Sequence, residues 1–92
     1  MDEIGSNATF QPSSDYKVQV LDGEAILLNV RTGAYFGANK VGTAIWDLYS
    51  QGLSVGEVTT KILERFEVEQ AQAEKDVIAY TRLLLDKGLL LK

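Results

Sequence analysis

The stretch Asp22–Asn39, "DGEAILLNVRTGAYFGAN", holds two turn signals and two strand patterns. Asp22-Gly23 is among the dipeptides most favoured in two-residue β-hairpins. The next seven residues, 24–30, alternate between two faces as a strand does, with Ala25, Leu27 and Asn29 opposite Ile26, Leu28 and Val30. Gly33 suits the left-handed position of a second hairpin. The stretch therefore predicts a third strand from Ala34 to Phe36 or Gly37.

The residues on both sides extend this pattern into a small α+β fold. Tyr16, Val18 and Val20 alternate with polar residues, which predicts a half-buried first strand. Asn39 can cap a first helix that ends near Gly52. A capping box, Ser54 with Glu57, begins a second helix. A third helix runs from about Glu69 to Lys87, with an inner face of Ala73, Val77, Tyr80, Thr81 and Leu84.

We therefore expect a winged helix-turn-helix-like fold, with a three-stranded antiparallel N-terminal sheet packed on three helices. Residues 1–15 are polar and carry the only proline, which predicts a flexible tail with an edge strand near Phe10. Residues 16–92 form the domain. After Gly88, the apolar residues 89–91 are expected to fold back on the core.

The composition removes most kinds of catalytic site. The chain has no cysteine and no histidine, so it lacks thiol nucleophiles, imidazole bases and the usual zinc ligands. No glycine-rich phosphate loop is present, and the many carboxylates of the later helices are typical of a solvated surface. We expect neither catalysis, nor a metal, nor a cofactor. The polar N-terminus is no signal peptide and no apolar run is long enough to span a membrane, so a cytoplasmic location is expected.

DNA binding is the alternative that the expected topology suggests. In such a fold the start of the third helix would enter the major groove. That segment here, "EVEQAQAEKD" from Glu67 to Asp76, is acidic, and the chain carries a net charge of −4. Because phosphates repel such a surface, we expect no nucleic-acid partner.

The third strand raises a different possibility. It would lie at one edge of the meander, yet residues 34–38 include no charge and no proline to protect that edge. The third helix or the N-terminal tail could simply cover it. The edge could also accept a guest peptide as an added strand, and Leu83, an apolar residue off the core-facing side of the third helix, would then be a groove wall rather than an ordinary exposed leucine. The candidate peptide-binding residues are Val30, Ala34, Tyr35, Phe36, Gly37, Asp76, Ala79, Tyr80, Leu83 and Lys87.

These motifs together resemble the coenzyme PQQ synthesis protein D family, the prototype of the RiPP recognition element. The resemblance covers residues 16–91 and includes the Asp22-Gly23 hairpin, the "TG-x-Y-F-G-x-N" strand, the "G-x-x-IW" helix and the "D-V-x-x-x-x-x-x-L" third helix. Ala38 departs from the family, in which a larger aliphatic residue commonly precedes the asparagine.

The resemblance implies a leader-peptide-binding adaptor that is not an enzyme. Stand-alone chains of this pattern resemble the recognition proteins of lasso-peptide biosynthesis, which deliver a precursor leader to a transglutaminase-like cysteine protease. The alternative within the family is a peptide chaperone of the PQQ pathway, which serves a radical S-adenosylmethionine enzyme. Without a guest, the open edge could pair with a second copy of the chain and form a weak homodimer.

Overall fold

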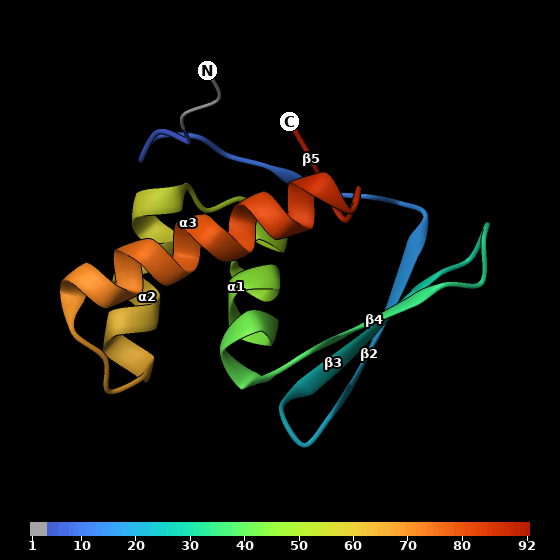
Figure 1. Ribbon diagram of the computed structural model, residues 1–92, viewed down its shortest axis with the longest axis horizontal. Coiled ribbons are helices and arrows are strands. Elements are labelled where there is room, and N and C mark those ends of the chain that lie inside the picture. The colour runs from blue at the N-terminus through green and yellow to red at the C-terminus, as the bar shows by residue number, and fades with distance from the viewer. Residues whose placement is uncertain (1–3) are drawn as a thin grey trace.

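A computed structural model describes residues 4–92 and places a three-stranded sheet beside three helices (Figure 1). The α+β fold predicted from the sequence is confirmed. In chain order the elements are β1 (Gln11–Pro12), β2 (Tyr16–Leu21), β3 (Glu24–Asn29), β4 (Tyr35–Ala38), α1 (Lys40–Ser50), α2 (Val55–Arg65), α3 (Gln70–Asp86) and β5 (Leu90–Leu91).

The sheet is the antiparallel meander β2-β3-β4, with β3 in the middle. Asp22 and Gly23 both have positive φ, 54° and 79°, as the predicted two-residue hairpin requires. Gly33 is left-handed at φ 80°. Strand β4 begins one residue later than expected because Ala34 still closes the turn, its N–H bound to Thr32 Oγ1 at 3.2 Å.

Helix α1 covers one face of the sheet, and all three helices lie on that side (Figure 1). Ala25 and Leu27 of β3 and Ala38 of β4 are buried on this inner face. Strand β2 differs from the expected half-buried strand, since Val18 and Val20 are 42% and 55% exposed. The reason is the position of α1, which packs over β3 and β4 and leaves the outer strand β2 largely in solvent.

The predicted helix ends are all present. The Asn39 side chain accepts a hydrogen bond from the Gly42 N–H at 2.8 Å. Ser54 and Glu57 form the reciprocal capping box, and these hydrogen bonds hold the pKa of the Glu57 carboxyl below its usual range. Gly88 follows α3 with φ 74°. Within residues 4–92, no helix has both the length and the apolar character needed to cross a bilayer.

A buried hydrogen bond joins α1 to α3 at the centre of the core. Tyr49 Oη and Thr81 Oγ1 are 2.7 Å apart, and neither residue is exposed to solvent. Because the Thr81 hydroxyl donates to the Val77 carbonyl at 2.6 Å, Tyr49 is the donor of this pair. The ring of Phe10 packs edge-on against Tyr49, with ring centroids 5.5 Å apart.

The N-terminal segment lies along the helices from Ile4 onward. Strand β1 pairs with β5. This pairing agrees with two expectations from the sequence, an edge strand near Phe10 and the folding back of residues 89–91 on the core. The Val55 N–H also donates to the Ala8 carbonyl at 2.9 Å. Residues 1–3 of the expected tail lie outside the described residues, and the flexibility expected of residues 1–15 stays a prediction.

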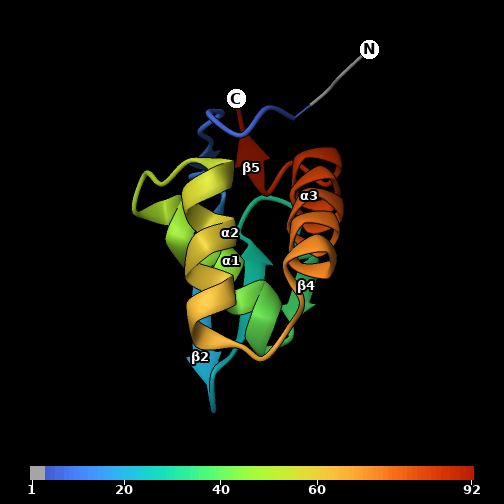
Figure 2. The same ribbon diagram turned by 90° about the vertical axis from the view of Figure 1, so that its left-hand side faces the viewer.

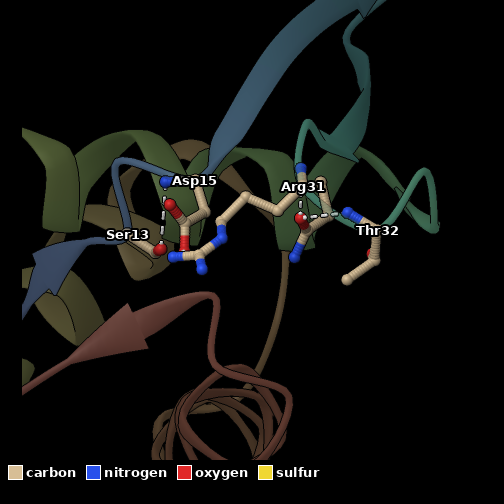
Figure 3. Close-up of polar contacts among 5 residues, drawn as sticks. Ser13, Asp15, Arg31 and Thr32 are labelled. Atoms are coloured by element: carbon tan, nitrogen blue, oxygen red, sulfur yellow. Dashed lines mark hydrogen bonds and ion pairs between the residues drawn. The ribbon is translucent and has the colours of Figure 1, made fainter.

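The loop after β1 is tied to the β3–β4 turn by polar contacts (Figure 3). Arg31 reaches back to the Asp15 carboxylate, with 3.8 Å between nitrogen and oxygen. Both side chains are largely exposed, so this ion pair adds little to stability. The stronger contact between the two segments is a backbone hydrogen bond, in which the Val30 N–H donates to the Asp15 carbonyl at 2.8 Å.

Replacing Thr81 with valine should lower the free energy of unfolding by about 1–3 kcal/mol, because the buried Tyr49 hydroxyl loses its acceptor. Thr60→Val is the matched control, since Thr60 makes the same type of bond to a helix carbonyl but is exposed. That variant should stay within about 0.5 kcal/mol of the wild type. Urea unfolding of the wild type and the two variants measures these free energies. An equal loss of stability in both variants would contradict the role of the buried hydrogen bond.

Candidate functional site

Strand β4 has one unpaired side, since β3 pairs with it on the other. The Asn29 N–H donates to the Ala34 carbonyl at 2.8 Å, and the antiparallel register continues from there. Because antiparallel pairs alternate, the main-chain groups of Phe36 and Ala38 point to β3, and those of Tyr35 and Gly37 point outward. Within residues 4–92, no backbone hydrogen bond outside the regular elements engages these two residues. They form an edge with donors and acceptors available.

A hollow of about 410 Å³ lies between the start of α1 and the exposed flank of α3. Figure 2 shows β4 and α3 on the same side of the molecule. The residues that line this hollow are Asn39, Val41, Gly42, Ile45, Asp76, Ala79, Tyr80 and Leu83. The rings of Phe36 and Tyr80, with centroids 6.4 Å apart, connect β4 to this hollow. The free edge of β4 and the hollow together form the candidate groove.

Tyr80 forms part of the groove floor because residue 42 is glycine. A Cβ atom on Gly42 would overlap the phenol oxygen and the neighbouring ring carbon of Tyr80. Burial raises the pKa of the Tyr80 phenol above its ordinary value. Its hydroxyl oxygen is buried and has no hydrogen-bond partner among residues 4–92. The floor therefore offers an apolar ring with one polar atom.

The chemistry of the candidate groove suits binding. Asp76 is exposed at its rim and accepts a hydrogen bond from Gln72 at 2.7 Å. Leu83, 37% exposed, supplies apolar surface on the same helix flank. Among the described residues, no three acidic, histidine or cysteine side chains come together as a metal site would require. Main-chain groups at the edge and apolar side chains beside it are the features that hold an extended peptide.

The predicted site residues divide into those near the hollow and those away from it. Asp76, Ala79, Tyr80 and Leu83 line the hollow, and Phe36 contacts it through Tyr80. Gly37 lies on the free edge. Tyr35 shares the free edge through its main chain, while its side chain lies on the opposite face of the sheet and the residue is 77% exposed. The other three lie outside the candidate groove: Val30 and Ala34 in the turn and Lys87 at the end of α3.

Helix α1 contributes residues to the hollow that were not predicted from the sequence. Asn39 was predicted only as a helix cap, and Val41 and Ile45 were not among the predicted site residues, yet all three line the hollow. Gly42 could have indicated this contact from the sequence. A glycine inside a helix lowers stability, so its presence indicates that a neighbouring group packs closely against the helix there. That group is the Tyr80 ring.

Gly42→Ala should lower the free energy of unfolding by roughly 1–3 kcal/mol, because the added methyl group displaces the Tyr80 ring. In a Tyr80→Ala background the same substitution should be neutral or stabilising, since alanine favours helix over glycine by about 1 kcal/mol. Urea unfolding of the four proteins gives the coupling energy between the two positions. A coupling near zero would show that the phenol does not occupy this space.

Comparisons with known proteins agree with this architecture. The family model of coenzyme PQQ synthesis protein D (PqqD) matches residues 24–90. One similar solved structure, a lasso peptide synthetase B1 complexed with the leader peptide, has a TM-score of 0.82 and 28% identity, over 92% of this chain and 100% of that one. Another, TbiB1 in complex with the TbiA(beta) leader peptide, has a TM-score of 0.80 and 32% identity, over 87% and 93%. No match was found among curated proteins.

The family match begins at β3 and ends in β5, so it includes β4, α1 and α3, which form the candidate groove. The resemblance inferred from the sequence motifs is confirmed: the protein belongs to the coenzyme PQQ synthesis protein D (PqqD) family.

Proposed function

We propose that this protein is a non-catalytic adaptor of lasso-peptide biosynthesis, which binds the leader of a ribosomally made precursor as a fourth strand on β4. The observation that carries the proposal is the unpaired β4 edge beside the apolar hollow. The two similar solved structures, both of leader-peptide complexes, support the class of ligand.

The edge sets the geometry of the proposed complex. Tyr35 and Gly37 present main-chain groups two residues apart, so a short extended segment of the leader can satisfy both. Alternate side chains of an added strand point to opposite faces. Those on the inner face would enter the hollow against Tyr80 and Leu83, where they add apolar contact to the main-chain bonds.

The adaptor would act in the cytoplasm by delivering the leader to a transglutaminase-like cysteine protease. A protein that binds both raises the effective concentration of the substrate at the protease. The leader pays an ordering cost when it becomes a strand, so its affinity has to come from a few anchor residues. The candidate groove supplies these anchors and no catalytic group, and residues 16–92 would form the binding domain.

A peptide chaperone of the PQQ pathway is the second candidate, favoured by the family model. Both functions use the same groove, so the identity of the bound precursor distinguishes them. Fluorescence anisotropy with labelled leaders of the two pathways would measure this preference.

Tyr35→Pro should abolish leader binding, because proline removes the outward N–H of the edge while the pairing with β3 uses Phe36 and Ala38. Tyr35→Ala keeps the N–H and should bind within a few-fold of the wild type. Isothermal titration calorimetry with the leader encoded nearest to this gene measures both, and circular dichroism checks the helices. Normal binding by the proline variant would rule out strand addition on β4.

Leu83→Glu should weaken leader binding at least about tenfold, because it places a charge in apolar surface that the leader would bury. Leu91→Glu is the control, an exposed leucine in β5 that does not line the hollow. The same calorimetry compares the two, with thermal unfolding to verify the fold. Equal affinities would place the leader's apolar anchors away from α3.

A further inference from the structure

The face of the sheet that points away from the helices is apolar and uncovered. The register places Leu21, Ile26, Leu28 and Tyr35 on it together, with Lys17, Gln19 and Glu24 around them. The four apolar side chains are between 41% and 77% exposed. All three helices lie on the opposite side (Figure 1). This outer face is the largest gathering of exposed apolar residues in the described chain, and such a surface usually marks an interface.

Gly37 lies on the same outer face and has no structural reason to be glycine. Its φ is outside the left-handed region, unlike those of Gly23, Gly33, Gly52 and Gly88. A Cβ atom added to it would meet nothing within 4 Å. Glycine inside a strand weakens the strand and often marks close approach by another chain. Because Gly37 has no side chain, it leaves a notch on the outer face. The notch lies between Tyr35, two residues earlier on β4, and Ile26, the residue of β3 that pairs with Gly37.

We propose that the outer face, centred on this notch, is the docking surface for the enzyme that processes the leader. The inference rests on the proposed function, because it places the leader on the β4 edge. A leader strand there continues the sheet, and every second side chain of the leader would join the outer face next to Gly37. The enzyme then contacts the adaptor and the bound leader on one continuous surface.

The size of the outer face favours this partner over a second copy of the chain. Strands β2 and β3 have six residues and β4 has four, so three strands about 4.8 Å apart cover roughly 200 Å². A stable interface buries about 800 Å² on each partner. Two outer faces packed together therefore fall well short of a stable dimer. An enzyme that also contacts the bound leader buries additional interface area on the leader itself. It should therefore bind the adaptor–leader complex more tightly than the adaptor alone.

The test measures leader binding and enzyme binding separately. The reagents are the full-length adaptor, the fluorescently labelled precursor leader and the leader protease encoded with it. Ile26→Lys and Leu28→Lys, both on the outer face of β3, should each weaken protease binding to the leader-loaded adaptor at least about tenfold. Both should leave leader affinity within about twofold, since the two side chains point away from the hollow. Leu91→Lys, at an exposed leucine of β5 outside the β2-β3-β4 sheet, is the control and should change neither affinity.

Three results would overturn the proposal. The first is unchanged protease binding by both variants. The second is loss of leader affinity in both variants, which would mean that the outer face serves the leader alone. The third is sedimentation of the empty adaptor as a dimer that Ile26→Lys dissociates, which would assign the face to a second copy. If the wild-type protein does not bind the leader at all, the proposed function fails, and this inference fails with it.

Discussion

The contact between the Tyr80 ring and Gly42 determines how closely α3 approaches the beginning of α1, and the candidate groove depends on it. Asn39 starts α1 directly after β4, so the position of α1 is tied to the strand. The buried Tyr49–Thr81 hydrogen bond holds the same two helices together deeper in the core. With the helices held at both points, the flank of α3 that carries Leu83 faces the hollow beside β4 instead of packing against α1.

The sheet then has three surfaces with different properties. The inner face is covered by α1 and stabilises the fold. The free edge of β4 offers main-chain groups beside apolar side chains, a combination that recognises extended peptides with little dependence on charge. The outer face is apolar but small, which suits a transient contact better than a permanent one. In the proposed function, the free edge of β4 binds the leader and the outer face binds the enzyme that processes it, so different surfaces of one sheet serve different contacts.

The sequence alone was sufficient wherever the signal is local. Positive φ at Asp22, Gly23 and Gly33 follows from the conformational preferences of aspartate and glycine in tight turns. The Asn39 cap and the Ser54–Glu57 capping box satisfy amide groups within their own helix ends. Helical periodicity predicts the residues that α3 buries, Ala73, Val77, Thr81 and Leu84, but it also placed Tyr80 among them, and Tyr80 is only partly buried and lines the hollow. The unprotected edge of β4 could also be inferred, because a meander leaves its last strand open.

Only the tertiary structure decided which surfaces meet. Helical periodicity marked Val41 and Ile45 as apolar but could not show that they line the hollow beside α3. Alternation placed Val18 and Val20 on the inner face but could not show that α1 stops short of β2. Sequence patterns record which side of an element is apolar, and the element that covers that side is set by packing between residues far apart in the chain. The sequence by itself therefore determined the helices and strands, their ends and the open edge of β4. The tertiary packing decided the groove, because its walls come from α1 and α3, which come together only when the hydrophobic core forms.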